Sequence, residues 1–488
     1  MFDLIIVIGY FSVMLYMGWR SRHQSADSYW IGERKYGTGR ISSSLVATIF
    51  GASSTMGIIG LGYSRGLTGA WWSLIGGIAL IPFAIFLASR VRRLKVYTLP
   101  DILKKAYGDR VAVPAGIMIS VAWCGVVAAQ LIAGGRLLAG FLSLDFQIAL
   151  MVVAIVFTLY TFWGGQISVI KTDMWQFLLF MGGLCVSLAF LLKAFSAQPQ
   201  LWHQIPPGHL GFPVSSGFGW YEVLVFYPLI IGLPYLVGPD IYSRTLCAKD
   251  DKVAGSAALR AAMIIIPISF LLALFGILAR AKFPGIPPET ALPEVLNQII
   301  PMGLRGLILA GFLGAIMSSA DTCLLSASTI LTLNVFRPFH GATGEAHLRI
   351  TRVAVLVLGF VAWLIASQQQ GIISSLLLGY TVFVGGVVFP TLAAFFKGRL
   401  RITSWGALGA VVAGGGAAIL GKIKGGALMK AIVTQRGQEF LEAVLGPHYL
   451  SILPIILCIL VMFVVSRVTP YRVQEGLSEG ISSRPTSG

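Results

Sequence analysis

Long apolar runs recur along the whole chain, and they constrain its fold more than any other feature. A membrane-spanning helix needs about 20 mainly apolar residues, and thirteen runs are candidates. Only 11% of the 488 residues are charged, against roughly 25% in soluble domains. We therefore predict an all-α integral membrane protein with 13 transmembrane helices, and a soluble protein or a single-pass receptor is excluded. The runs cover residues 2–18, 42–63, 69–89, 112–135, 146–163, 172–193, 221–238, 261–280, 304–335, 353–367, 371–396, 404–421 and 448–466.

The positions of Lys and Arg predict the orientation of these helices. If the N-terminus is outside, the inside segments hold 26 of the 36 Lys and Arg residues, as expected for cytoplasmic loops. We therefore expect a multi-pass protein of the cell (plasma) membrane with a cytoplasmic C-terminus. The net charge of +17 has the same explanation, and we expect no nucleic-acid partner. The first run has no basic segment before it and is read as a retained helix.

Other features limit what else the chain contains. The tail after Arg467 has about 20 polar residues, so we expect no fused signalling domain. The five cysteines give neither a disulfide framework nor metal-ligand spacing. The metalloprotease motif HExxH does not occur. The serine-hydrolase pattern GxSxG matches GYSRG (62–66) and GLSEG (476–480), but the first ends an apolar helical run and the second lies in the polar tail, not between a strand and a helix. We therefore expect no enzyme, and the isolated polar positions do not form the continuous lining of a passive channel.

Polar clusters inside the apolar runs indicate where function lies, because buried polar groups in a membrane are costly. The second run contains the small and hydroxyl residues of GASSTMG near Gly51. Such a cluster forms either a helix-packing surface or a break whose free carbonyls hold a cation. The ninth run places Ser318, Ser319, Asp321 and Thr322 within about one turn, and these are hard oxygen ligands suited to alkali cations.

A second break is predicted in the seventh run, where IGLPYLVGPDIYSR contains two glycines and two prolines. With the first helix set aside, the two interrupted runs occupy matching positions in two five-helix halves. That arrangement is typical of an inverted-repeat transporter with its site at the membrane midplane. We expect an extra N-terminal helix and loop (1–41), two repeats (42–195 and 196–400) and two C-terminal helices with a tail (401–488).

Several segments, in this order and spacing, resemble the solute:sodium symporter family. They are ATIFGASSTMGIIGLGYSRGLTGAWW, YTLPDILKKAYG, GGQISVIKTDMWQ, GPDIYSRTLCAKD and AGFLGAIMSSADTCLLSAST. The resemblance covers nearly the whole chain to about Arg467. It implies a 5+5 inverted repeat of the leucine-transporter type with broken first and sixth core helices. It also implies sodium-driven uptake of a small solute through the lipid bilayer.

The resemblance also implies ion ligands. The principal sodium site falls on Ala47, Phe50, Ala315, Ser318 and Ser319. In members similar to the sialic acid symporter a second site exists, and its ligands fall on Asp173, Ser318, Asp321 and Thr322. Asp321 stands where that branch has a hydroxyl, so the second site would hold two carboxylates. That leaves three alternatives open: a tighter Na⁺ site, a proton shared between the carboxylates, or neutralisation by Arg244. One or two Na⁺ ions are therefore expected.

The positions that match the family's substrate contacts are Gly51, Ser53, Ser54, Tyr235, Tyr380, Thr381 and Phe383. The sugar-carrying branch has Asn and Gln where this chain has Ile49, Ser54 and Val382, which disfavours a sugar because unmet polar groups are costly. We expect an amino acid such as proline, or a monocarboxylate, with its carboxylate facing backbone N–H groups at a break. The alternatives are proton coupling through Asp173 and Asp321, or sodium-coupled transport of a sugar, sialic acid or a vitamin.

Overall fold

The computed structural model describes residues 2–339, 344–368, 371–422 and 435–471. These residues form helices, and the described chain contains no β-strand, only isolated bridges such as Tyr36–Ala248. The α-helices are α1 (Phe2–Arg20), α2 (Ala26–Ile31), α3 (Thr38–Ile49), α4 (Ile58–Arg65), α5 (Trp71–Pro82), α6 (Ala88–Arg93), α7 (Leu99–Tyr107), α8 (Asp109–Leu142), α9 (Phe146–Ala197), α10 (Leu233–Val237), α11 (Pro239–Leu246), α12 (Asp251–Lys282), α13 (Ala291–Gln298), α14 (Leu304–Ile330), α15 (Gly344–Gln368), α16 (Ile372–Phe383), α17 (Phe389–Phe395), α18 (Lys397–Leu400), α19 (Ser404–Lys422), α21 (Gln435–Leu445) and α22 (Tyr449–Val468).

Eleven helical segments of the described chain are long and apolar enough to cross a membrane, where the sequence predicts 13 helices. Two of them, Ser53–Arg93 and Phe146–Ala197, have 41 and 52 residues, which is far more than the about 20 that one crossing needs. Each contains a glycine with positive φ, Gly66 (77°) and Gly165 (55°), and each covers two neighbouring predicted runs. Helical structure thus continues through tight turns that the pattern treats as loops, and the number 13 remains a prediction.

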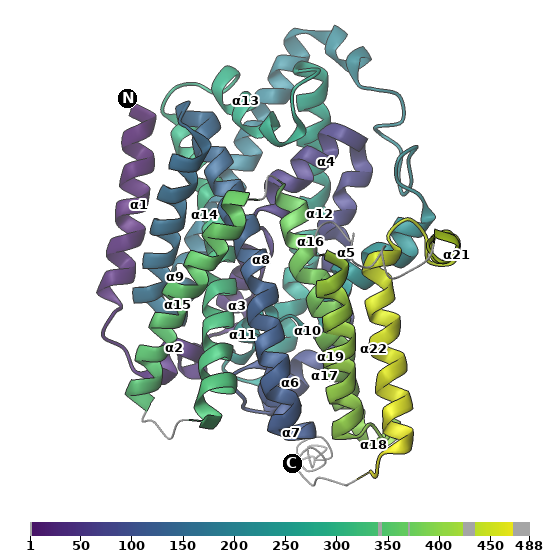
Figure 1. The fold of residues 1–488 in the computed structure, drawn as a ribbon. Helices are drawn as coiled ribbons and strands as arrows, with labels where there is room; N and C mark the ends of the chain where they lie inside the picture. Colours follow the sequence, from purple (N-terminus) through teal and green to yellow (C-terminus); the bar gives the residue numbers. More distant parts are fainter. Residues whose placement is uncertain (1, 340–343, 369–370, 423–434, 472–488) are drawn as a thin grey trace, which may run out of the picture.

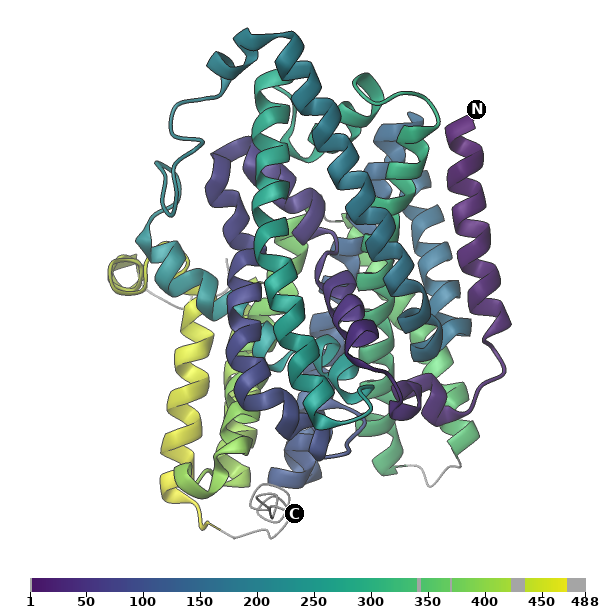
Figure 2. The ribbon, with the colours of Figure 1, turned by 180° about the vertical axis from the view of Figure 1, so that it is seen from behind.

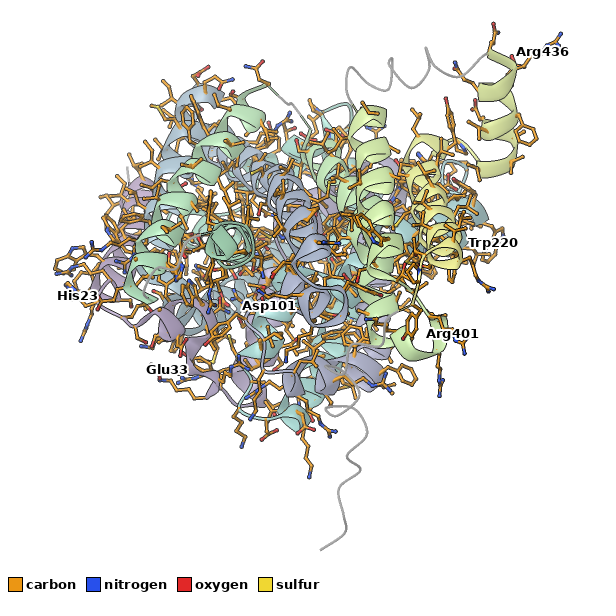
Figure 3. The ribbon with its side chains drawn as sticks, turned by 60° about the horizontal axis from the view of Figure 1, so that its bottom comes forward. His23, Glu33, Asp101, Trp220, Arg401 and Arg436 are labelled. Carbon is orange, nitrogen blue, oxygen red and sulfur yellow. The ribbon has the colours of Figure 1, made fainter. Side chains whose placement is uncertain are left out.

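The helices form one upright bundle with two distinct ends (Figure 1). The helices α2, α6, α7 and α18 lie at one end, which we call the α7 end, and α13 and the start of α1 lie at the opposite, α13 end. The basic segments that they carry therefore gather at the α7 end. In the view of Figure 3, where this end comes forward, Asp101 lies nearer the centre and His23, Glu33 and Arg401 lie toward the rim. The predicted tail from residue 472 onward lies outside the described residues.

Helix α14 occupies the centre of the bundle and packs against α8 and α9. It is buried over nearly its whole length, as expected for a helix whose surface is apolar or small all round. By contrast, α1 lies at the outer edge in both views, and α19 and α22 pack together on the opposite flank (Figures 1 and 2). The polar residues of α14 are therefore held at the point where several helices converge.

The connection before α10, residues 199–220, is tied to the α13 end of the bundle. The carbonyl of His209 accepts a hydrogen bond of 2.7 Å from the Leu67 N–H, and the Trp71 indole donates to the Pro213 carbonyl at 2.8 Å. Both partners lie at the turn between α4 and α5, where the 3-10 helix η3 (Gly66–Ala70) reverses the chain. This connection therefore covers the α4–α5 turn.

Candidate ion and solute site

Helix α3 breaks beside α14, where the sequence predicts an interruption near Gly51. Its last turn closes with a hydrogen bond of 3.0 Å from the Phe50 N–H to the Val46 carbonyl. The backbone then leaves the helix at Phe50 (φ −80°, ψ 52°) and becomes helical again in the π-helix η2 (Ser53–Gly57). The buried carbonyls of Ala47 and Phe50 accept no hydrogen bond from the described residues. Buried carbonyls are normally paired, so these two are suited to hold a cation.

Gln130 of α8 holds the broken segment in place. Its Oε1 accepts a hydrogen bond of 2.6 Å from the Ala52 N–H, and the Thr55 hydroxyl donates to the Gly51 carbonyl at 2.6 Å. A Cβ added to Gly51 would overlap both the Ser319 hydroxyl and the Gln130 amide. Sequence reasoning missed Gln130, although a lone amide within the apolar run 112–135 was a signal for it.

The two hydroxyls of α14 face different partners. The Ser319 hydroxyl donates to the Thr48 carbonyl, next to Ala47 on the last turn of α3. The Ser318 hydroxyl instead donates to Asp173 Oδ1 of α9 at 2.7 Å. Ala315 lies one turn before Ser319 on the same buried stretch of α14. The structure therefore brings Ser319 to the last turn of α3 before the break, and it turns the Ser318 hydroxyl to Asp173.

A fully buried ion pair lies beside these hydroxyls. Arg244 Nη2 of α11 is 3.5 Å from Asp173 Oδ2, and both side chains are 0% exposed. The Ser44 hydroxyl also donates to Asp173, and Arg244 donates to the hydroxyls of Thr322 and Thr48. Of the three alternatives left open by the sequence, neutralisation by Arg244 is what the structure contains at Asp173.

One expectation needs correction here. Arg244 was counted among the basic residues of an inside loop, but α11 carries it into the bundle core, where it pairs with Asp173. Without Arg244, the predicted inside segments still hold 25 (26 − 1) of the 36 Lys and Arg residues, so the predicted orientation does not change. Within the predicted second ion site of Asp173, Ser318, Asp321 and Thr322, Arg244 contacts both Asp173 and Thr322, and this site stays a prediction.

Asp321 faces a different neighbour from the rest of that set. Its Oδ1 accepts a hydrogen bond of 2.8 Å from the Thr161 hydroxyl of α9, whereas Oδ2 is buried without a hydrogen-bond partner among the described residues. Successive residues of an α-helix point about 100° apart, so Asp321 and Thr322 leave α14 in different directions. The described residues contain no group of three His, Cys, Asp or Glu that would hold a metal ion.

A small cavity lies between the break in α3 and a second break, at Gly238 (ψ 135°) between α10 and α11. Pro239 follows as the first residue of α11, a position that needs no N–H. The free volume is about 20 Å³, which is room for about one water molecule. The lining comes from both breaks, α8, α14 and α16 and includes Ile49, Ser53, Ser54, Gln130, Tyr235, Asp240, Ser319, Cys323 and Tyr380.

Four predicted substrate positions contribute to this lining: Ser53, Ser54, Tyr235 and Tyr380. The other three predicted positions do not. Gly51 packs against Ser319 and Gln130, the Thr381 hydroxyl donates to the Leu377 carbonyl of its own helix at 2.7 Å, and the Phe383 ring packs on Trp123 with centroids 4.7 Å apart. Sequence reasoning also missed Asp240, whose signal was a carboxylate directly after the glycine and proline of the second break.

A narrow polar pocket of about 10 Å³ continues from the second break toward α7. It is lined by Pro239 and Ser243 of α11, Thr98 and, on α14, Ser326 and Thr329, whose hydroxyls are buried without a partner among the described residues. Below it, Asn334 of the π-helix η9 (Leu331–Phe336) accepts from the Thr98 hydroxyl and donates to Asp101, both at 2.7 Å. These hydrogen bonds fasten α7 to the end of α14.

Comparisons with known proteins agree with this geometry. The model of the sodium:solute symporter family matches residues 29–414. The chain is 25% identical to a sodium/glucose cotransporter of Vibrio parahaemolyticus over 460 residues, covering 84% of this chain and 83% of that protein. It is 26% identical to the osmoregulated proline transporter OpuE of Bacillus subtilis (strain 168), covering 84% and 87%. The solved outward-open structure of a Na⁺-coupled sialic acid symporter superposes with a TM-score of 0.75 at 19% identity, covering 96% and 98%, and has the leucine-transporter fold.

Proposed function

The chain belongs to the sodium:solute symporter family, and from this membership we propose that it imports a small organic solute by Na⁺ symport and alternating access. The observation that carries the proposal is the break in α3. There, two buried carbonyls, those of Ala47 and Phe50, accept no hydrogen bond from the described part of the chain, and they lie at the helix end to which the Ser319 hydroxyl donates. Such a group of neutral oxygens suits a cation that must bind and then leave.

In this proposal, Na⁺ binds to the carbonyls of Ala47, Phe50 and Ala315 and to the hydroxyls of Ser318 and Ser319. Because the Ser319 hydroxyl donates its proton to the Thr48 carbonyl, its oxygen lone pairs remain available to the ion. Binding joins α3 to α14 and favours the state that accepts solute from outside. The membrane potential then assists entry, since each charge that crosses 100 mV contributes about 2.3 kcal/mol.

The solute binds, we propose, between the two breaks, against Ser53, Ser54, Tyr235 and Tyr380, and the cavity of about 20 Å³ widens to admit it during alternating access. An amino acid such as proline or a monocarboxylate is the expected class, and the similarity to a proline transporter supports it. The similarity to a glucose cotransporter keeps a sugar as a candidate solute, but Gln130 is the single side-chain amide among the described lining residues. Sialic acid and vitamins are further candidate solutes.

A second candidate, proton coupling, is favoured by one observation. The two buried carboxylates Asp173 and Asp321 share one buried cation, Arg244, which pairs with Asp173. Asp321 therefore remains with one unpartnered oxygen, and an uncompensated buried carboxylate tends to bind a proton or another cation. In this mechanism, Asp321 carries the proton that accompanies the solute.

Uptake into liposomes that contain the purified full-length protein separates the two candidates. External Na⁺ is replaced by K⁺ at fixed pH, with the membrane potential held equal, and labelled amino acids, monocarboxylates and sugars are offered. Na⁺ symport predicts concentrative uptake in Na⁺ alone. Uptake that persists undiminished in K⁺ and follows a pH gradient would instead support proton coupling, and Asp321→Asn should then abolish it. A solute that equilibrates without accumulating contradicts both candidates.

A further inference from the structure

Asp240 brings a formal charge to the cavity between the two breaks. The other described lining residues are apolar, hydroxyl, thiol or amide side chains, so Asp240 alone is charged. It is the second residue of α11, directly after Pro239, and the second break therefore fixes its backbone position at the cavity. A solute in this cavity lies close to one carboxylate.

The Asp240 carboxylate accepts hydrogen bonds from the N–H groups of Asp240 and Ile241 at the start of α11, and Arg244 attracts it from a distance. Among the described residues, no Lys, Arg or His forms an ion pair with its carboxylate. Arg244 lies one turn further along α11, but its guanidinium pairs with Asp173 and donates to Thr322. None of these groups is a directly paired cation, so a cationic solute would add an interaction that the carboxylate lacks. The cavity is therefore electrostatically complementary to a cation.

Two tyrosines supply aromatic surface to the same cavity. The Tyr235 ring is seated on Gly76 of α5, where an added Cβ would overlap the ring, and the Tyr380 ring packs against Trp123 at a centroid distance of 6.4 Å. Aromatic faces attract ammonium groups electrostatically through the ring quadrupole. The rings thus favour the same kind of solute group as the carboxylate does.

We infer that Asp240 makes this cavity selective for solutes that carry a cationic nitrogen, and that it excludes simple monocarboxylates. The inference rests on the proposed function, because it takes this cavity as the solute site. An anion without a nitrogen would place two negative charges together in a desolvated space. A neutral sugar would leave the carboxylate without a counter-charge. A protonated or quaternary nitrogen satisfies both the carboxylate and the rings.

Matched solutes test the inference with the full-length protein in detergent. Three pairs differ in whether a cationic nitrogen or a carbon is present: proline and cyclopentanecarboxylate, alanine and isobutyrate, glycine betaine and tert-butylacetate. Glucose is added as a neutral solute, and pyrrolidine as a cation without a carboxylate. Thermal unfolding is measured with each solute in Na⁺ and in K⁺, because a bound solute raises the unfolding temperature. Choline is avoided as a replacement ion, since it is itself a quaternary cation.

The expected result is stabilisation by at least one cationic member and none by its carbon analogue. Asp240→Asn should weaken that binding at least about tenfold, which corresponds to about 1.4 kcal/mol, and Asp240→Glu should retain part of it. Asp109→Asn is the control, because Asp109 is half exposed at the start of α8, where it pairs with Lys104. If Asp240→Asn does not fold, the inference is tested by the unfolding temperatures of the native protein with the two members of each solute pair.

Several results would overturn the inference. They are equal or stronger stabilisation by a carbon analogue or by glucose, no stabilisation by any cationic member, and unchanged affinity in Asp240→Asn. If Asp240→Asn alters only the response to Na⁺, Asp240 is an ion ligand and the inference is wrong. Na⁺ dependence tests the proposed function separately: a cationic solute that binds equally in Na⁺ and K⁺ contradicts sodium coupling but leaves the role of Asp240 intact.

Discussion

Arg244 and Asp173 form an ion pair of 3.5 Å in which neither side chain has any contact with solvent. The guanidinium comes from α11, just beyond the second break, and the carboxylate comes from the second half of α9. The same guanidinium donates to hydroxyls on α3 and α14. One buried cation thus connects four helices around the proposed ion site, and its removal has consequences for both stability and ion binding.

We predict that Arg244→Gln destabilises the protein by about 3–5 kcal/mol, because it leaves the buried Asp173 carboxylate without its cation. Thermal unfolding in detergent measures the loss. The double variant Arg244→Gln with Asp173→Asn should recover much of it, since no uncompensated charge then remains. A double variant as unstable as the sum of both single variants would show that the two residues do not interact energetically.

Ser319→Ala is expected to weaken Na⁺ binding more than folding. It removes one proposed ligand and a neutral hydrogen bond, whose net contribution to stability is about 1 kcal/mol. Titration of the unfolding temperature with Na⁺, at ionic strength held constant with K⁺, should show about a tenfold loss of affinity. Ser328→Ala is the matched control, because its buried hydroxyl donates only within α14, to the Leu324 carbonyl. Equal effects of the two variants would contradict the ion site.

Gln130→Leu should disturb the break in α3, because the buried Ala52 N–H loses its 2.6 Å acceptor. An unsatisfied buried donor costs about 1–3 kcal/mol, and we expect both a lower unfolding temperature and weaker Na⁺ binding. Gln130→Glu keeps an acceptor and should retain more of both. Gln147→Leu serves as control, since Gln147 is exposed at the start of α9. Normal Na⁺ affinity in Gln130→Leu would mean that the break does not need this anchor.

The hydrogen bonds of Asn334 to Thr98 and Asp101 hold α7 against η9 and so close the polar pocket at the α7 end. Asn334→Ala removes both bonds and should open this pocket more often. The readout is the rate at which a membrane-impermeant maleimide labels Ser326→Cys in the polar pocket, in a Cys185→Ser background that removes the exposed native thiol. If the free energy that favours the closed pocket falls by about 1.4 kcal/mol, labelling should be about tenfold faster. Asn297→Ala removes a comparable hydrogen bond at the α13 end and should leave the rate unchanged; an unchanged rate in both variants would refute the closure.

The sequence predicts the parts of this fold that depend on local chemistry. Runs of apolar residues predict the helices, and glycine, proline and hydroxyl residues predict the breaks near Gly51 and Gly238, because these residues disfavour a continuous helix. The exact number of crossings is harder, because the apolar pattern separates two runs at Gly165 whereas helical structure continues through this turn.

The side-chain partners in the site depend on how helices distant in sequence meet. The pattern of apolar runs predicts that Arg244 lies in a loop, although α11 carries it inward to Asp173. It grouped Asp321 with Thr322, although the two side chains leave α14 in different directions. It overlooked Gln130 and Asp240, because a single polar residue in an apolar run does not reveal which other helix it faces.

The reversal of α9 at Gly165 limits how this transporter can be engineered. One residue with positive φ joins the two halves of the helix, and an added Cβ there would overlap the ring of Tyr29, whose hydroxyl donates to the Thr161 carbonyl at 3.0 Å. Thr161 in turn bonds to Asp321. An epitope tag or fluorescent reporter spliced in at this position would push the Tyr29 ring aside and displace the carboxylate beyond it, so this turn is a poor insertion point for labelling.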